Sequence, residues 1–310
     1  MTQVGTDPFK QPGSFWRGNI HTHSTRSDGA LEPEEVVLRY KAEGYDFLAM
    51  TDHFVGLFDY PLTDISAYAD ECFTTILGAE LHTGAMDNGE IWHILAVGLP
   101  TDFAPPDAPD FQPIAAPESA PALAQRARDA GAFVAIAHPD WSQMTLADAA
   151  SIKAAHAVEV YNHGCFNGCD RGYGFHIYER LLAAGRKLTL CATDDAHFFE
   201  PDHFGGWVVV KARENTAPAL LSALKEGAYY ASTGPEFHDV VWEDDHVEVS
   251  SSAVSAVILQ GRSTRTVVRH GHSMTRTVLR FDKLAPSPWL RVTIVDAAGK
   301  RAWMNPIWRD

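Results

Sequence analysis

The sequence predicts an α/β fold in which parallel strands are joined by helical crossovers, followed by a small β-sandwich. Strand and helix patterns alternate through the first part of the chain, which is typical of βαβ units. The helical patterns stop after residues 230–235, and short β-rich segments follow. We therefore place a domain boundary near Gly234, with a β/α barrel over residues 1–234 and a β-sandwich over residues 235–310. A chain of 310 residues with 45% hydrophobic content is large enough for both.

The elements of the expected barrel follow from hydrophobic patterns and their flanking residues. Short apolar segments predict strands at Gly18–Ser24, Asp46–Thr51, Thr75–Leu81, Ile91–Gly98, Ala132–Ala137, Ala157–Tyr161, Leu188–Thr193 and Trp207–Lys211. Helices are predicted at Pro33–Glu43, Ser119–Ala130, Leu146–Ala155, Phe175–Ala184 and Thr216–Glu226. Pro33 stands in a first turn, and Gly131 and Gly185 follow the ends of two helices. The Pro- and Asp-rich segment Thr101–Pro117 is expected to be a long surface loop.

The C-terminal part shows only strand patterns. These predict strands at Ala253–Leu259, Thr275–Phe281, Trp289–Val295 and Arg301–Ile307. The segment Asp296–Gly299 is expected to form a hairpin turn between the last two. Between Arg262 and Lys283, six basic residues stand against one acidic residue. We interpret them as the solvated face of a hairpin that turns at His270–His272, in preference to a nucleic-acid contact.

Composition and charge exclude several classes of function. The net charge of −15 opposes stable binding to duplex nucleic acid, because a polyanion needs a basic surface. No apolar segment approaches the ~20 residues that a spanning helix needs, and residues 1–13 lack the pattern of a secretory signal. We therefore expect a cytoplasmic protein without a membrane partner. The four cysteines form neither a disulfide framework nor a CxxC zinc knuckle, so we interpret them as small buried hydrophobes.

The segment His21-Thr22-His23 is the strongest indication of function. Two imidazoles one residue apart on a strand point to the same face, so both can bind one metal ion. Further imidazoles and carboxylates stand at or just beyond the ends of other predicted strands: Asp52, His53, Glu80, His93, His138, Glu159, Asp195 and His197. In an α/β barrel these strand ends converge on one mouth. One such histidine is more often structural, but burying this many titratable groups needs a compensating charge, which divalent metal supplies.

These motifs resemble those of the polymerase and histidinol phosphatase (PHP) family of metal-dependent phosphoesterases. The matching segments run in the family's order: His21-Thr22-His23, Ser27-Asp28-Gly29, Thr51-Asp52-His53, Gly78-Ala79-Glu80, Trp92-His93-Ile94-Leu95, Ala137-His138-Pro139, residues 158–162 and residues 193–197. The resemblance implies a distorted seven-stranded β/α barrel, similar to a TIM barrel, that carries two to three divalent ions.

The resemblance also implies a ligand set. One ion would be held by His21, His23, Glu80 and Asp195, a second by Glu80, His93 and His138, and a third by Asp28, His53 and His197. Of these ligands, we expect Glu80, Asp195 and His197 to take part most directly in catalysis. Each site has nitrogen and oxygen ligands, leaves room for water and lacks a thiolate, which is typical of open catalytic sites for Zn, Mn or Fe.

The expected activity is hydrolysis of a small phosphoester, with nucleotides or short oligonucleotides among the candidates. The expected nucleophile is a hydroxide held between two ions, so no protein nucleophile is required. Because the same chemistry can attack a carbonyl carbon, a carbamate or related ester hydrolase is the neighbouring alternative. A different alternative is a non-catalytic PHP domain that uses the metals to hold its fold. The complete ligand set opposes this last interpretation.

Three further residues are expected to contact the substrate. Arg26 lies in the loop between His23 and Asp28 and is expected to hold a phosphate in a bidentate contact, with a surface ion pair as the alternative. His163 and Arg171 follow a strand end and are expected to form a substrate wall.

Three further polar residues stand beside the expected ligands in the sequence. His82 stands two residues after Glu80 and competes with His93 as a ligand, but the Trp-His-Ile-Leu context favours His93. Asp52 and Asp194 are expected to orient imidazoles through the nitrogen that does not bind metal.

Overall fold

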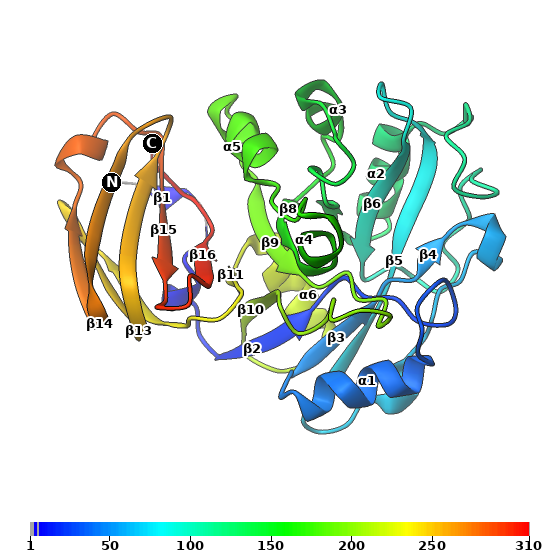
Figure 1. The fold of residues 1–310 in the computed structure, drawn as a ribbon, viewed down its shortest axis with the longest axis horizontal. Coiled ribbons are helices and arrows are strands. Elements are labelled where there is room, and N and C mark those ends of the chain that lie inside the picture. The colour runs from blue at the N-terminus through cyan, green and yellow to red at the C-terminus, as the bar shows by residue number, and fades with distance from the viewer. Residues whose placement is uncertain (1–2, 5, 310) are drawn as a thin grey trace.

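The computed structural model describes residues 3–4 and 6–309 and is a mixed α/β fold (Figure 1). Its α/β part contains strands β2 (Ser14–Asn19), β3 (Phe47–Met50), β4 (His53–Phe54), β5 (Thr74–Ala85), β6 (Ile91–Val97), β7 (Phe133–Ile136), β8 (Ala157–Asn162), β9 (Thr189–Thr193), β10 (Trp207–Ala212) and β11 (Tyr229–Ser232). The helices are α1 (Pro33–Ala42), α2 (Ala120–Asp129), α3 (Leu146–Ser151), α4 (His163–Cys169), α5 (Phe175–Ala183) and α6 (Ala217–Glu226). No helix in the described part of the chain is long and apolar enough to cross a membrane.

The strand directions agree only in part with the expected parallel arrangement. β2, β3 and β5 run parallel to one another, and so do β7, β8 and β9. β6, however, is antiparallel to both of its neighbours, β5 and β7. β10 is antiparallel to β2. The prediction of parallel strands is therefore wrong for β6 and β10.

The expected closed barrel is not seen, because β9 and β10 form no ladder in residues 6–309. β10 uses one edge to pair with β2 and the other to pair with β11, so neither edge is left for β9. The backbone N–H of Leu190 in β9 instead donates to Oδ1 of Asn305 at 2.9 Å. The sheet is therefore open at this seam, and a side chain from the end of the sequence covers part of it.

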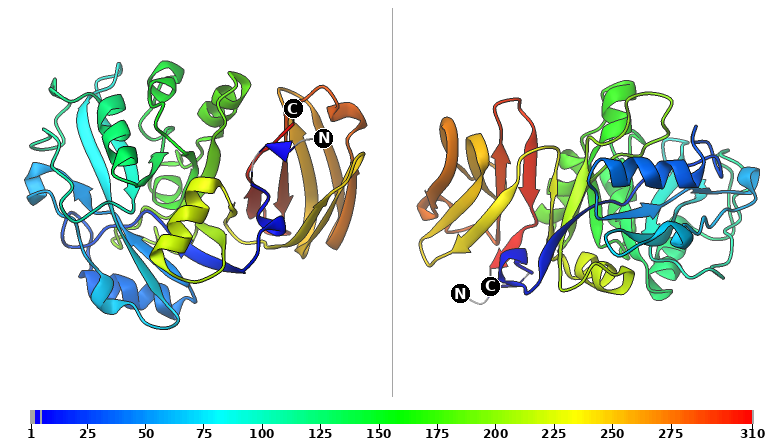
Figure 2. Two further views of the ribbon diagram at one scale, coloured as in Figure 1. Left: turned by 180° about the vertical axis from the view of Figure 1, so that it is seen from behind. Right: turned by 90° about the horizontal axis from the view of Figure 1, so that it is seen from below.

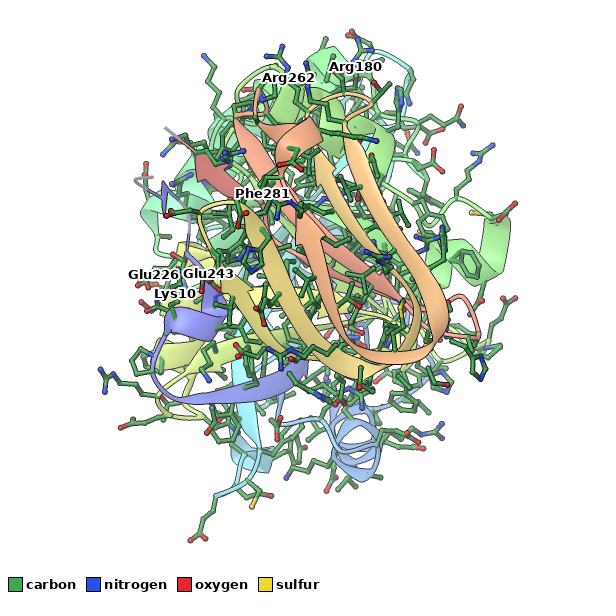
Figure 3. The ribbon with its side chains drawn as sticks, turned by 90° about the vertical axis from the view of Figure 1, so that its left-hand side faces the viewer. Lys10, Arg180, Glu226, Glu243, Arg262 and Phe281 are labelled. Atoms are coloured by element: carbon green, nitrogen blue, oxygen red, sulfur yellow. The ribbon has the colours of Figure 1, made fainter. Side chains whose placement is uncertain are left out.

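Long antiparallel strands follow Gly234 and lie at one end of the molecule (Figure 1, yellow to red). They are β12 (Phe237–Trp242), β13 (His246–Gly261), β14 (Thr266–Arg280), β15 (Trp289–Val295), β16 (Arg301–Met304) and β17 (Ile307–Arg309). β16 pairs with β11, and β17 pairs with the N-terminal β1 (Gln3–Val4). These strands thus continue the sheet of the α/β part, as Figures 2 and 3 show from other sides. A separate sandwich is not confirmed, and the domain boundary near Gly234 stays a prediction.

Of the two predicted hairpin turns, one is wrong and one is confirmed. His270–His272 lie inside β14, which pairs with β13 on both sides of them. The register shifts at this point, where Val254 and Ala256 of β13 pair with residues four apart in β14, so a bulge replaces the turn. Asp296–Gly299 does join two antiparallel strands, β15 and β16. Gly299 has a φ of 83°, a conformation that glycine adopts without strain.

The buried core fixes the chain where it approaches the ends of β2 and β3. Ile20, Phe47, Ala49 and Leu95 are fully buried in one hydrophobic cluster. Gly18 of β2 lies against the Phe47 ring of β3, and a Cβ at this glycine would overlap that ring. Only glycine therefore allows β2 and β3 to pair this closely, which places the segment after β2 at the mouth of the sheet.

Candidate metal centre

The segment after β2 carries the first two imidazoles. β2 ends at Asn19, and the chain continues to Thr22, whose backbone forms an isolated parallel bridge with Ala196. The backbone N–H of His23 donates to the Ala196 carbonyl at 2.9 Å. The side chains of His21 and His23 are fully buried, and their ring centroids lie 5.3 Å apart. This extended segment therefore brings the two imidazoles together, although the strand itself ends before them.

Glu80, in β5, stands at the centre of the cluster. Its Oε1 lies 2.8 Å from Nδ1 of His93 and 2.9 Å from Nε2 of His138. Its Oε2 lies 2.7 Å from Nδ1 of His53 and 3.6 Å from Nε2 of His21. The two oxygens of one buried carboxylate thus face two sets of imidazoles, which suits a ligand shared by two ions.

His93 reaches Glu80 because β5 and β6 are antiparallel. In an antiparallel pair, the start of one strand lies beside the far part of the other. His93 is near the start of β6, and it pairs in register with His82, two residues after Glu80. The departure from parallel topology therefore still places His93 at the same edge of the sheet as the other ligands.

Asp195 completes the group around His21 and His23. Its backbone has a φ of 55°, in the left-handed region that Asp tolerates better than most residues. Its Oδ1 lies 2.9 Å from Nε2 of His23 and 3.2 Å from Nε2 of His21. Its Oδ2 accepts a hydrogen bond from Nδ2 of Asn162 at 3.0 Å. The ligand atoms of His21, His23, Glu80 and Asp195 all lie within 4.8 Å of one another, so they can surround one ion.

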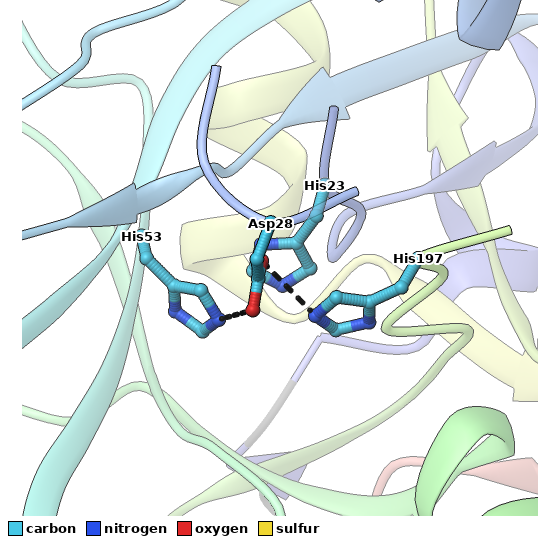
Figure 4. A group of neighbouring side chains, drawn as sticks. All are labelled: His23, Asp28, His53 and His197. Atoms are coloured by element: carbon cyan, nitrogen blue, oxygen red, sulfur yellow. Dashed lines mark ion pairs between the residues drawn. The ribbon is translucent and has the colours of Figure 1, made fainter. Parts of the chain in front are cut away.

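A second group lies nearer the surface (Figure 4). The exposed Asp28 has one carboxylate oxygen 3.4 Å from Nε2 of His53 and the other 3.4 Å from Nε2 of His197. Nδ1 of His23 lies 3.9 Å from the same carboxylate. The ligand atoms of His23, Asp28, His53 and His197 also lie within 4.8 Å of one another. The structure thus brings together the three residues expected at the third site and adds His23.

A third group contains His53, Glu80, His82 and His93, which brings His82 into the cluster beside His93. Nδ1 of His82 donates to the Trp92 carbonyl at 3.2 Å, so its Nε2 is an acceptor, 2.9 Å from Nδ1 of His53. His93 lines the open cleft over the cluster, whereas the fully buried His82 does not. His82 is therefore placed to hold the ring of His53, and His93 is the better ligand for an ion that meets substrate.

Acceptors around the cluster fix the protons of two further imidazoles. Nδ1 of His21 donates to Glu159 at 2.8 Å, and Nδ1 of His197 donates to the Asp195 carbonyl at 3.0 Å. When either ring is neutral, its lone pair is therefore on Nε2, the nitrogen that faces the carboxylates of the cluster. Neutral imidazoles with a free nitrogen are the form that binds metal.

The charges of the cluster need a cation. Burial raises the pKa of the Glu80 carboxyl, but the imidazoles of His93 and His53 outweigh burial and hold it well below its usual range. Burial and the imidazoles of His197 and His53 lower the pKa of His23 to about 4, so this ring is neutral at pH 7. Among the described residues, no hydrogen-bond partner is found for three buried atoms of the cluster: Oε2 of Glu80, Nε2 of His21 and Nδ1 of His23. Such orphaned atoms are costly unless a metal ion takes them as ligands.

Glu159 accepts hydrogen bonds from residues of the cluster and from their neighbours, a role that the sequence did not indicate. Besides binding His21, its carboxylate accepts hydrogen bonds from the backbone N–H of His138 at 2.7 Å and from Nδ2 of Asn162 at 3.0 Å. The hydroxyl of Thr193 also donates to it. Glu159 and His21 are 138 residues apart, so no local pattern connects them. The only signal was the place of Glu159 on a strand within the family motif.

The expected roles of Asp52 and Asp194 are wrong. Asp52 accepts hydrogen bonds from the backbone N–H of Ser24 at 2.7 Å and from the hydroxyl of Thr63. Asp194 accepts hydrogen bonds from the backbone N–H groups of residues 204–206. Both carboxylates therefore hold the loops that carry ligands, and neither orients an imidazole directly.

The cluster forms the floor of a cleft of about 580 Å³. Its walls are lined by Glu90, Ile91, Phe111, Trp141, Gly164, Cys165, Gly168, Cys169, Phe199, Glu200 and Asp202. Trp141 lies over two of the ligands, with ring centroids 4.9 Å from His138 and 5.3 Å from His93. Phe111 comes from the long loop expected at residues 101–117. Of the described residues that line the cleft, none is lysine or arginine.

The three residues expected to contact substrate lie outside this cleft. Arg26 is exposed and lines a separate hollow with Glu32 and Tyr68. Arg171 is exposed and follows α4. Residues of α4 line the cleft, but Arg171 does not. The ring of His163 is held by Tyr161, because Nδ1 of His163 lies 2.9 Å from the Tyr161 hydroxyl. The geometry therefore gives no support to these residues as phosphate contacts.

We expect the single changes Arg26→Ala and Arg171→Ala to alter kcat/KM for a phosphoester by less than about threefold, because neither guanidinium faces the cleft. A charged hydrogen bond to the substrate is worth roughly 1.5–3 kcal/mol, so its loss would lower kcat/KM about ten- to a hundredfold. Steady-state kinetics distinguish the two cases. A tenfold loss of kcat/KM in either variant would indicate that the residue does contact the substrate.

A solved structure with a TM-score above 0.5 supports the architecture, and two further solved structures are similar at lower scores. A two-domain protein from Bacteroides vulgatus, which contains a predicted PHP-like metal-dependent phosphoesterase, has a TM-score of 0.53 at 19% identity and covers 98% of this chain and 100% of its own. A candidate metal-dependent phosphoesterase from Bifidobacterium adolescentis has a TM-score of 0.38 at 19% identity over 59% of this chain and 89% of its own. An amidohydrolase from Chromobacterium violaceum, with bound sulfate and no metal, has a TM-score of 0.42 at 18% identity over 58% and 87%.

The region of the chain that holds the cluster matches a known sequence family. No curated protein matches this chain in sequence. The family model of the PHP domain, however, matches residues 19–198. This range includes every residue of the three ligand groups and more than half of the chain. The chain therefore belongs to the PHP family.

Proposed function

We propose that this protein is a metal-dependent phosphoesterase that hydrolyses a small phosphoester. One observation carries the proposal: the buried carboxylate of Glu80 directs its two oxygens at two sets of imidazoles on the floor of an open cleft. A structural metal site is closed by protein ligands on all sides. Here the ligands His93, His138 and Asp195 border the cleft, so a substrate can reach them.

The residues present fit two to three divalent ions, of which Zn, Mn and Fe suit nitrogen and oxygen ligands. The proposed ligands are His21, His23, Asp28, His53, Glu80, His93, His138, Asp195 and His197. Ions bound there would supply Lewis acidity and an activated water at neutral pH.

The protein's own part in the reaction is to hold ligands and to shape the space above them. Glu159 keeps the proton of His21 on Nδ1, and the Asp195 carbonyl does the same for His197, so both rings present Nε2. Trp141 packs on His93 and Phe111 packs on His53, and both rings line the cleft. Because the ligands are fixed before substrate arrives, little reorganisation is needed during the reaction.

The walls of the cleft favour a substrate with a single phosphoryl group. None of the described wall residues is a lysine or arginine, so the metal ions would be the main source of positive charge. Glu90, Glu200 and Asp202 would repel a second phosphate beyond the reacting one. The acidic walls therefore favour a phosphomonoester over an oligonucleotide as the substrate.

The same observation favours a second candidate function, hydrolysis of a carbamate or carboxylic ester. Such substrates carry no phosphate charge, and a cleft without basic side chains suits them. The aromatic walls of Trp141, Phe111 and Phe199 would accept an apolar leaving group. The attack would then be on a carbonyl carbon, with the same residues holding the ions.

A test combines metal analysis with a substrate panel. We expect elemental analysis of protein purified without chelator to show more than one equivalent of Zn, Mn or Fe per chain. The metal-defined protein is then assayed with phosphomonoesters, phosphodiesters, aryl carbamates and carboxylic esters, with duplex DNA as a substrate that should not react. Chelation should abolish turnover, and reconstitution with metal should restore it.

The outcomes separate the candidates. Faster turnover of phosphomonoesters supports the first function, whereas turnover of carbamates alone replaces it by the second. Less than half an equivalent of metal, with no gain on reconstitution, would overturn both.

A further inference from the structure

We propose a second ligand site, a pocket for a compact polyanion, at the end of the sheet opposite the metal centre. It is a cavity of about 380 Å³ that lies where β8 and β9 begin, beside Ala155, His156 and Thr189. The metal cluster lies where the same strands end, beside Asn162 and Thr193. The cavity is lined by five basic side chains, Arg128, Lys153, Arg186, Lys187 and Lys225. This proposal does not depend on the proposed enzymatic function.

The concentration of positive charge is unusual for this chain. The protein has a net charge of −15, with 40 acidic residues against 25 basic ones. No ion pair joins any of the five cations to a carboxylate in the part of the chain that the structure describes. Glu226 is the acidic residue of the lining, and its carboxylate accepts a hydrogen bond from Ser222 (Glu226 is labelled in Figure 3). With five cations against one carboxylate, the lining of the cavity has a net positive charge.

Part of this charge has a structural purpose. Arg128, Arg186 and Lys225 stand at or just beyond the ends of helices, where cations stabilise the negative end of the helix dipole. Arg128 donates to the Ala154 carbonyl at 2.8 Å, and Lys225 donates to the Gly131 carbonyl at 3.0 Å. These hydrogen bonds fix the two side chains. Because a carbonyl group carries no net charge, they do not neutralise the positive charge of the side chains.

Among the described residues, Lys153 and Lys187 donate to no backbone carbonyl. The ammonium group of Lys187 lies 5.6 Å from the ring centroid of Trp308, and Lys153 makes no side-chain hydrogen bond within residues 6–309. Both side chains are exposed. Their gathering with three fixed cations around one cavity costs repulsion. A bound anion would remove that repulsion.

His156 adds a neutral donor to the lining. Its Nδ1 accepts the backbone N–H of Val134 at 3.0 Å, so the proton is on Nε2. Burial, with the charges of Arg128 and Lys225, lowers the pKa of this imidazole to about 4, so it stays neutral at pH 7. The remaining polar atom of His156 is thus an N–H donor at the cavity, where an anion would accept it.

The lining selects the class of ligand. A single phosphate contacts two or three cations, whereas five cations spread around 380 Å³ suit an anion with several phosphoryl groups. The metal cleft, with its acidic walls, has the opposite preference. We therefore assign the cavity to a condensed phosphate or an oligophosphate group, held by Lys and Arg and by the His156 donor.

The test is calorimetric titration of the metal-loaded protein with inorganic tripolyphosphate, in excess orthophosphate to occupy the metal centre. The double variant Lys153→Gln/Lys187→Gln removes the two cations without a structural bond. Its matched control is Arg262→Gln/Lys283→Gln, which removes the same charge from exposed positions elsewhere. We expect the cavity variant to bind roughly tenfold or more weakly and the control to bind like the wild type. Equal binding by all three proteins would overturn the proposal.

A second measurement locates the anion on the unmodified protein. Acetylation of lysines by acetic anhydride is followed by peptide mass spectrometry, with and without tripolyphosphate. We expect slower acetylation of Lys153, Lys187 and Lys225 and an unchanged rate at Lys283. Protection that is absent from these three lysines, or uniform over the chain, would mean that tripolyphosphate binds elsewhere and the cavity is not its site.

Discussion

The change Glu80→Gln is expected to remove at least one metal ion and to lower kcat roughly a hundredfold or more. Glutamine keeps the shape of the side chain but removes the charge that faces both sets of imidazoles. Its amide nitrogen is also a donor, so one set of ligands would lose its oxygen partner. Elemental analysis and steady-state kinetics measure the two effects together.

The control for this change is Glu214→Gln, which removes one charge from an exposed position. It should keep both metal content and kcat. Circular dichroism should show that both variants are folded. If Glu80→Gln kept the full metal content and the wild-type kcat, Glu80 would not be shared between two ions, and the proposed centre would have to be reduced to separate sites.

The second large effect is expected at Glu159, which touches no substrate and binds no ion in the proposed centre. Glu159→Gln replaces one carboxylate oxygen by an NH2 group. On one side this group would face the donors of His138 and Asn162, and on the other side those of His21 and Thr193, so two donors would face each other in either orientation. A buried donor without an acceptor costs roughly 1–3 kcal/mol of the free energy of unfolding. A neutral amide also accepts the Nδ1 proton of His21 less strongly than a carboxylate does, so metal affinity should fall about ten- to a hundredfold.

Two measurements separate these effects at Glu159. Denaturant unfolding of the metal-free protein reports the stability loss, and titration with metal reports affinity. At saturating metal the variant should regain most of its kcat, because Glu159 is a positioning residue. A variant with normal metal affinity and a permanently low kcat would instead place Glu159 among the groups that meet the substrate.

Each residue of the candidate metal centre is marked in the sequence by a local motif, and the structure brings these residues together. His21 and His23 alternate in an extended segment, and Asp28 follows within the same loop, so residue type and spacing suffice. The positions of buried strands such as β3 and β7 were also close, since these strands are short apolar segments between turns, whereas β2 ends at Asn19, before the end of the predicted strand. Such signals are contained in a few consecutive residues.

Other features depend on contacts between distant segments and were missed. The direction of β6 cannot be read from its own residues, because parallel and antiparallel buried strands are equally apolar. The bulge in β14 was mistaken for a turn, since His270-Gly271-His272 has turn composition but lies opposite a paired strand. Arg26 stands near ligands in sequence, yet its side chain lines another hollow. Proximity along the chain did not predict on which side of the loop it lies.

The insertion of β11 beside β10 has a consequence for the order in which the protein can fold. β2 is made early, but its partner strand β10 lies about 190 residues later, and β11 must wait for β16. Such non-local pairings are slow to form, because a long loop must close before any contact forms. His21 and His23 are therefore synthesised well before Asp195 and Ala196, which hold them. During synthesis on the ribosome, the first histidines of the metal centre leave the ribosome without their partners, and the centre can be assembled only after His197 has emerged.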